Sequence, residues 1–192
     1  YMPEGTSYNS YIVKGDNYTA LIDCSDPEKE DQFLANLTAA DIVTIDYIIL
    51  LHAEQDHSGT INSVKKKYPN AKIVCTEKVK QLMQIHFVLN DDEFLLFKQG
   101  EVLDLGNTSL KFYSIPFAHW PDNTMVHMMP ENILFSSDLF GSHNTTFREI
   151  EEINTQVHSS ARSYYSEIMM PFRKNIAKHV RTVSEIAPLI IA

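Results

Sequence analysis

The sequence predicts an α/β (α+β) fold built as a four-layer αββα sandwich, in which two facing sheets carry helices on their outer surfaces. Two observations support this prediction. The chain has two stretches rich in short apolar segments, and helical segments are interleaved with both. No repeat, low-complexity block or linker separates the halves, so each half needs the other to cover its apolar face. We therefore expect residues 1–192 to form one domain.

The first half is expected to contain four strands and three helices. The strands are apolar runs bounded by turn residues, and Gly15-Asp16-Asn17 forms the tight turn of an N-terminal hairpin. The expected strands are residues 8–14, 18–23, 45–51 and 72–75. Helices are expected where apolar side chains recur at helical spacing, in residues 27–37, 60–67 and 76–88.

The second half is expected to contain more strands and one long helical segment. The expected strands are residues 94–98, 102–105, 109–114, 125–129, 132–135 and 188–191, with a turn at Pro130-Glu131. A polar connection, 141–152, leads to a helical segment over residues 161–183. Proline lacks a backbone N–H and clashes with the preceding turn, so this segment should break at Pro171.

Charge and apolar content exclude two classes of partner. The formal net charge is −9 at pH 7, whereas a nucleic-acid-binding face is basic. No run reaches the roughly 18 apolar residues of a membrane span, and no signal peptide is recognisable. Cys24 and Cys75 lie in apolar, strand-like segments and are expected to be buried free thiols in a reducing cytoplasm. Because the first residue is Tyr1, we expect a segment truncated at both ends.

The densest group of potential ligands follows the apolar run 45–51. His52, Glu54, Asp56 and His57 place two imidazoles and two carboxylates on a strand-to-helix loop. In an extended segment His52 and Glu54 point to the same face, whereas the adjacent Asp56 and His57 point apart unless the loop curls around a metal ion. Solvated charge runs seldom interleave histidines with acids directly after a buried strand. The cluster therefore predicts metal binding.

Two later strands end in further candidate ligands. His119 follows the strand 109–114, and Asp138 follows the strand 132–135. Alone, each has a more ordinary interpretation, as a hydrogen-bonded loop histidine and as a turn-capping aspartate. Together with the first cluster they supply six donors, and a carboxylate such as Asp138 can bridge two cations about 3.5–4 Å apart. We therefore predict a pair of metal ions.

These residues carry a family resemblance. The pattern H-x-E-x-D-H after a strand, with a later His and a later Asp, resembles the metallo-β-lactamase superfamily. Most hydrolases of that superfamily have His at the third position, where this sequence has Glu54. That glutamate, with the segments HWPD (119–122) and SDLFG (137–141), resembles the flavodiiron proteins. The segments 6–11 and 164–171 are also similar to that family, so the resemblance covers essentially the whole chain.

The resemblance implies a role for each donor. The family has one more histidine on the second iron, in a Ser-His-Gly turn expected just after Ala192. His143, His158 and His179 are expected to be surface or capping residues rather than substitutes for it. The implied set is His52, Glu54 and His119 on one iron, Asp56 and His57 on the other, and Asp138 bridging both.

The resemblance also implies a function, that of a non-haem diiron oxidoreductase reducing O2 to water, NO to nitrous oxide, or both. Mixed nitrogen and carboxylate ligands suit iron that cycles between ferrous and ferric states. Flavodiiron proteins carry FMN on a C-terminal flavodoxin-like domain, and residues 1–192 contain no Gly-rich phosphate loop after a strand. The implied partners are FMN outside this chain, a rubredoxin-like or flavin-containing electron donor, and a second copy in a head-to-tail homodimer.

Two alternatives stay open. A dizinc hydrolase of the same fold would use a bridging hydroxide to attack an ester, thioester or lactam. Zinc binds such ligands more tightly than ferrous iron at equal availability, so the donor types alone do not exclude it. A standalone diiron protein without a flavin domain would act as an oxygen-binding sensor. Glu54 favours iron over zinc, and thus discriminates the hydrolase from the other two.

The residues around the cluster have two possible roles each. Asp23 and Asp122 either orient ligand imidazoles or cap turns. Aromatic side chains are more often core residues than catalytic ones. Four of them are nevertheless candidates for donating protons or excluding water at the site: Tyr8, Tyr164, Tyr165 and Trp120.

Overall fold

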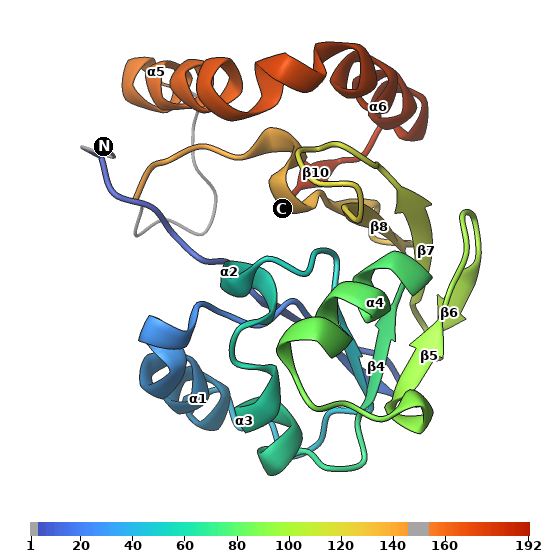
Figure 1. Ribbon diagram of the computed structural model, residues 1–192. Helices are drawn as coiled ribbons and strands as arrows, with labels where there is room; N and C mark the ends of the chain where they lie inside the picture. The colour runs from blue at the N-terminus through green and yellow to red at the C-terminus, as the bar shows by residue number, and fades with distance from the viewer. Residues whose placement is uncertain (1–3, 146–153) are drawn as a thin grey trace.

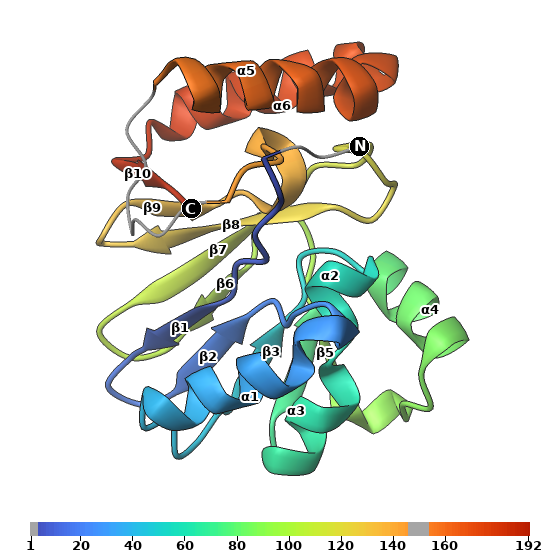
Figure 2. The same cartoon turned by 90° about the vertical axis from the view of Figure 1, so that its left-hand side faces the viewer.

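The computed structural model describes residues 4–145 and 154–192, and it has four layers (Figure 1). Two sheets face each other in the middle, with one group of helices below them and one helical pair above them. Figure 2, turned by 90°, shows the same stacking from the side. The four-layer αββα prediction is therefore confirmed.

The first sheet has five strands in the order β1-β2-β3-β4-β5. The β1–β2 hairpin is antiparallel, whereas the other neighbouring pairs are parallel and so need crossover connections. The strands are β1 (Tyr11–Lys14), β2 (Thr19–Ile22), β3 (Tyr47–Ile49), β4 (Lys72–Cys75) and β5 (Phe94–Leu96). The helices of the crossovers are η1 (Pro27–Lys29), α1 (Glu30–Ala39), α2 (Gln55–Ser58), α3 (Ile61–Lys67), α4 (Glu77–His86) and η2 (Asp91–Glu93).

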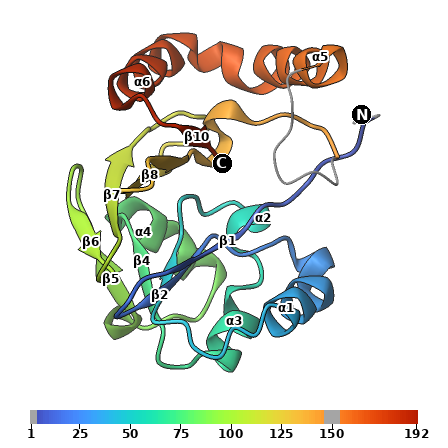
Figure 3. The same cartoon turned by 180° about the vertical axis from the view of Figure 1, so that it is seen from behind.

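The second sheet has the order β10-β9-β8-β7-β6 and is antiparallel except for the β10–β9 pair. Its strands are β6 (Val102–Asp104), β7 (Ser109–Ser114), β8 (Thr124–Met129), β9 (Ile133–Phe135) and β10 (Ile190–Ile191). Its outer face carries α5 (Thr155–Tyr164) and α6 (Arg173–Ile186), joined by a π-helix, η4 (Tyr165–Met169), and a 3-10 turn, η5 (Met170–Phe172). Seen from behind, the C-terminus lies beside β10, the edge strand of the second sheet (Figure 3).

The apolar side chains form three layers of core. Along β2 the side chains alternate, so that Leu21 faces the helices below while Ala20 and Ile22 face the second sheet. The central layer between the sheets includes Ile49 and Phe112. A third layer joins the second sheet to the α5–α6 pair. Both sheets are therefore covered on both faces over the described residues, as the long apolar runs required.

Most expected elements are found, with ends that differ by a few residues in either direction. The strand 72–75 is observed unchanged as β4, and 109–114 as β7. The long helical segment starts earlier, at Thr155, and it is interrupted at 165–172, around Pro171 as expected. The one-turn helix α2 was not expected, because four residues are too few to show a helical period. The polar connection 141–152 lies partly outside the described residues.

The strand ends place the candidate ligands together. β3 ends three residues before His52, β7 precedes the loop that carries His119, and β9 precedes the short 3-10 helix η3 (Ser137–Phe140), which carries Asp138. The chain thus brings donors from both sheets to one edge of the sandwich. Among the described helices, none is both long enough and apolar enough to cross a membrane.

The central layer yields a stability prediction. Ile49 is fully buried between the sheets, so Ile49→Ala removes packed methyl groups and leaves a cavity. We expect a loss of about 2–5 kcal/mol in the free energy of unfolding, measured by chemical denaturation. Val88 is 97% exposed, and Val88→Ala should change this free energy by less than about 0.5 kcal/mol. Similar losses in both variants would contradict the layer assignment.

Candidate metal centre

His52 follows β3 by three residues and is fully buried. The backbone on each side of it is fixed by a carboxylate: the Leu51 amide donates to Asp23 Oδ1 and the Ala53 amide donates to Asp122 Oδ2, both at 2.8 Å. The Leu51 carbonyl also accepts a hydrogen bond from Thr124 at the start of β8. The segment that begins the ligand cluster is therefore held to both sheets.

The helical turn α2 places the second pair of donors. The amides of His57 and Ser58 both donate to the Glu54 carbonyl, which closes the turn and brings His57 back toward the site. Gly59 ends α2 where a Cβ would lie 2.5 Å from the side chain of Pro27. Only glycine permits this close approach, so α2 packs directly on η1.

The loop after β7 carries His119. Its ends are joined by a hydrogen bond from the Ile115 amide to the Asn123 carbonyl, and the Phe117 amide donates to the Trp120 carbonyl. Phe117 has a φ of 66°, a left-handed conformation that is costly for a bulky residue, and the Ala118–His119 peptide bond is cis. The loop thus presents His119 from a tightly folded turn rather than from a regular element.

Asp138 lies on η3, after β9. Ser137, directly before it, also has a left-handed φ, of 51°. The Asn123 side-chain amide donates to Asp138 Oδ2 at 3.1 Å, which links this carboxylate to the loop of His119. After the turn, Gly141 lies so close to the ring of Tyr164 that a Cβ would be 2.5 Å from it. Asp138 is therefore placed by contacts on both of its sides.

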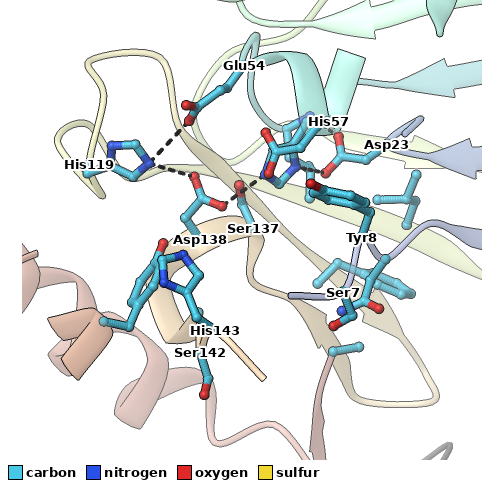
Figure 4. Close-up of a pocket in the computed structure, with 18 of the residues that line it drawn as sticks. Ser7, Tyr8, Asp23, Glu54, His57, His119, Ser137, Asp138, Ser142 and His143 are labelled. Atoms are coloured by element: carbon cyan, nitrogen blue, oxygen red, sulfur yellow. Dashed lines mark hydrogen bonds and ion pairs between the residues drawn. The ribbon is translucent and has the colours of Figure 1, made fainter. Parts of the chain in front are cut away.

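Four donor atoms converge at one position. Single ligand atoms of His52, Glu54, His119 and Asp138 all lie within 4.8 Å of one another. Glu54 Oε2 is 3.2 Å from His52 Nε2 and 3.3 Å from His119 Nε2. Asp138 Oδ2 is 3.5 Å from His52 Nε2 and 3.4 Å from His119 Nε2. Figure 4 shows the contacts of His119 with Glu54 and Asp138. Two imidazoles and two carboxylates therefore surround a space of the size that one metal ion needs.

A second group of donors adjoins the first. His57 Nε2 is 2.9 Å from Asp138 Oδ1 and 3.7 Å from Asp56 Oδ2. Asp56 Oδ1 is buried and has no hydrogen-bond partner within the described part of the chain. Asp138 thus turns one oxygen toward each group, as Figure 4 shows for His119 and His57. This is the arrangement of a carboxylate that bridges two cations.

The pKa values of the first group of donors favour a positive charge on its imidazoles. Burial lowers the pKa of His52, but hydrogen bonds with Asp122 and Glu54 raise it to about 9. Burial also lowers the pKa of His119, and Asp138 and Glu54 raise it to about 9. Hydrogen bonds from His119 and His52 lower the pKa of Glu54 to about 2. The carboxylates therefore stabilise a cation at this position, whether a proton or a metal ion.

Two further aspartates orient the imidazoles. His52 Nδ1 donates to Asp122 Oδ2 at 2.9 Å, and His57 Nδ1 donates to Asp23 Oδ2 at 2.8 Å. With Nδ1 protonated in this way, each Nε2 lone pair is free to point into the site. Of the two roles considered for these aspartates, contact with an imidazole is the observed one.

Five of the six donors line a cavity of about 240 Å³, and the fully buried His52 lies behind them. Its other walls include Tyr8 from the N-terminal segment and Tyr164 from α5. Trp120 packs its ring edge-on against His52, with 5.1 Å between ring centroids. Tyr165 is largely exposed and does not line this cavity. Three of the four aromatic candidates therefore lie at the site.

Two histidines differ from the surface or capping roles expected for them. His143 lines the cavity and packs edge-on against Tyr164, with ring centroids 5.1 Å apart. His179 is 4% exposed, because α6 turns it inward onto the loop of His119. His158 is exposed, as expected. Helical spacing around His179 was the one sequence signal available, since it shares a face with the apolar Ile176 and Val183.

The residues present fit a metal pair. The donor set contains only imidazole nitrogen and carboxylate oxygen, and the free thiols of Cys24 and Cys75 are buried, as expected, and belong to no such cluster within the described ranges. Such ligands suit iron, manganese or zinc rather than soft, thiolate-preferring ions. Asp56 Oδ1, which is buried without a hydrogen-bond partner among the described residues, and the shared carboxylate of Asp138 both offer the oxygen that such ions bind.

Comparison with known proteins finds one matching family over nearly all of the chain. Residues 6–192 match the family described as ODP family beta lactamase. The coenzyme F₄₂₀H₂ oxidase of Methanothermobacter marburgensis is 38% identical over 98% of this chain and 48% of its own length. The anaerobic nitric oxide reductase flavorubredoxin of Aliivibrio fischeri is 36% identical over 95% of this chain and 37% of its own length. The chain thus spans half or less of these curated relatives.

Solved structures agree with the sequence matches. The flavodiiron protein of Giardia intestinalis has a TM-score of 0.89 and 29% identity, over 96% of this chain and 46% of that one. The rubredoxin oxygen:oxidoreductase of Desulfovibrio gigas has a TM-score of 0.88 and 29% identity, over 100% of this chain and 49% of that one. The fold and the arrangement of its layers are therefore those of flavodiiron core structures.

The contact between Asp122 and His52 yields a prediction. Asp122→Ala removes the acceptor that fixes the His52 ring, so metal affinity should fall about 10–100-fold in a competition with a chelator. Asp122→Asn keeps an oxygen acceptor and should lose less. Asp46 likewise accepts a backbone hydrogen bond, from Thr19, but lies directly before β3, at the opposite end from His52. Asp46→Ala is the control, and a loss of metal affinity there as large as in Asp122→Ala would refute the orienting role.

Proposed function

The chain is a flavodiiron-type member of the ODP beta-lactamase family, and on that basis we propose that its six donors bind two non-haem iron ions that reduce O2 to water, NO to nitrous oxide, or both. The observation that carries the proposal is the position of Asp138, with Oδ1 facing His57 and Oδ2 facing His52 and His119. A terminal ligand would need only one of these oxygens.

Glu54 supports iron over zinc. Its carboxylate lies between His52 and His119, at the place where the related hydrolases have an imidazole. Hard anionic oxygen stabilises the ferric state and so suits an ion that changes oxidation state. When bound, two neighbouring ferrous ions would supply two electrons at once. Reduction of two NO to nitrous oxide and water takes two electrons, whereas reduction of O2 to two waters takes four, so the other two would come from the external electron donor.

Two aromatic residues beside the donors would supply a hydrogen-bond donor and exclude water. Burial raises the pKa of Tyr164, and the charges of Asp138 and Asp56 raise it further, so its phenol stays protonated at neutral pH. Tyr164 Oη therefore remains a hydrogen-bond donor at the wall of the cavity. The ring of Trp120 covers His52 and limits the access of water from that side.

We further propose the partners that such a reaction needs. The electrons come from FMN on a flavodoxin-like domain outside residues 1–192, reduced by a rubredoxin-like or flavin-containing donor. A head-to-tail homodimer would bring that flavin beside the irons of the other copy. The free thiols of Cys24 and Cys75 support a reducing, cytoplasmic location.

Metal analysis tests the proposal. The full-length protein, purified without oxygen, should contain about two iron ions per chain and consume O2 or NO when its flavin is reduced. Stoichiometric zinc together with esterase activity would overturn it in favour of a hydrolase. Two irons with reversible O2 binding and no turnover would instead identify an oxygen sensor.

Substitution of the bridging residue is a sharper test. Asp138→Ala removes a ligand of both ions and should lower the content of both, whereas His119→Ala should chiefly lower one. The exposed His158 supplies a control, since His158→Ala should leave the metal content unchanged. Metal content would be measured by elemental analysis of folded protein. Equal content in Asp138→Ala and the parent protein would refute the bridging assignment.

A further inference from the structure

The loop that carries His119 is held from outside by α6. His179 is 4% exposed, and its Nε2 donates a hydrogen bond of 2.9 Å to the carbonyl of Pro116. Because a carbonyl only accepts, this contact fixes the proton of His179 on Nε2. Among the described residues, no other donor reaches the Pro116 carbonyl. His179 therefore connects α6 to a point three residues before His119.

A second contact from the same helical segment reaches the same loop. The ring of Phe117 stacks on Phe172 of η5, with centroids 5.7 Å apart and planes inclined by 21°. Phe117 is also the residue of this loop that has a left-handed φ, a conformation that persists only where surrounding contacts stabilise it. The stack holds Phe117, and the hydrogen bond from His179 holds the adjacent Pro116. Together these two contacts stabilise the left-handed conformation of the loop.

Packing alone does not account for a histidine at position 179. The neighbouring positions of this face of α6, Ile176 and Val183, pack on the loop and the sheet with apolar side chains. Burial lowers the pKa of His179, so the imidazole is kept neutral and serves as a hydrogen-bond donor rather than as a charge. A buried imidazole costs free energy unless it is hydrogen-bonded. Here its hydrogen-bond partner is the Pro116 carbonyl, in the loop that carries His119.

We propose that His179 is a positioning residue for the metal centre, which acts through the Pro116 carbonyl to keep His119 Nε2 facing Glu54 and Asp138. The inference rests on the proposed function, because it concerns the metal held by those three side chains. It assigns to α6, which supplies none of the six donors, a role in the affinity of one of the two metal positions.

Cobalt binding to the full-length protein, freed of metal by chelation, tests this role. His179→Leu fills the space but cannot donate, and His179→Gln keeps a donor at the position of Nε2. We expect His179→Leu to weaken binding at one of two Co²⁺ positions by about 10–100-fold and to alter its visible absorption. His179→Gln should retain the affinity and spectrum of the parent protein.

Val183→Ala is the matched control. It removes packing from the same face of α6 and keeps His179, so it should lower the thermal stability without changing Co²⁺ affinity. Equal losses of Co²⁺ affinity in His179→Leu and His179→Gln, parent affinity in His179→Leu, or losses that follow stability in all three variants would overturn the inference.

Amide hydrogen exchange separates this inference from the proposed function. If the parent protein binds no Co²⁺, the metal centre itself is refuted, and the loop is then tested without metal. Exchange at Phe117 and Ala118, whose amides are hydrogen-bonded within the loop, should be faster in His179→Leu than in His179→Gln. Equal exchange in the two variants would overturn the positioning role.

Discussion

The carboxylate of Asp138 is the contact on which the rest of the site depends. Its Oδ1 meets His57, which follows the first sheet, and its Oδ2 meets His119, which belongs to the second. A negative group shared by three imidazoles would be poorly stabilised if either sheet shifted, since charge–charge contacts weaken with distance. The position of one sheet relative to the other is therefore coupled to the geometry of the Asp138 side chain.

The fold stabilises several unfavourable backbone conformations around that contact. Left-handed φ angles occur at Asp23, Phe117 and Ser137, and each of these either orients a ligand or lies within two residues of one. Such conformations cost of order 1–3 kcal/mol each in a non-glycine residue. The three apolar layers offset this cost, so the sandwich is a rigid support for loops that would not adopt these shapes alone.

Much of this arrangement could be predicted from the sequence because its signals are local. The strands at 72–75 and 109–114 are apolar runs between turn residues, and the cluster after β3 brings four donors together within a few residues. The one-turn helix α2 escaped prediction because four residues carry no period. Its turn is set by the Glu54 carbonyl, which accepts from two amides, and not by the spacing of apolar residues.

What could not be predicted depends on contacts between distant segments. Whether Asp122 caps a turn or orients His52 is decided by a contact across 70 positions of the sequence. The burial of His179 follows from the packing of α6 on a loop 63 positions earlier, and the half-buried position of His143 follows from its contact with Tyr164. From the sequence both histidines were predicted to be surface or capping residues. Only their tertiary contacts show that they are not.

The separation of the donors along the chain has a consequence for biosynthesis. His57 and Asp138 are 81 positions apart, and α6 comes later still. A ribosome releases the chain from its amino end, so the early histidines and acids emerge long before the later donors. If the six donors bind metal as proposed, tight capture of an ion would wait until the second sheet has closed on the first, and a loaded protein would be one whose folding has finished.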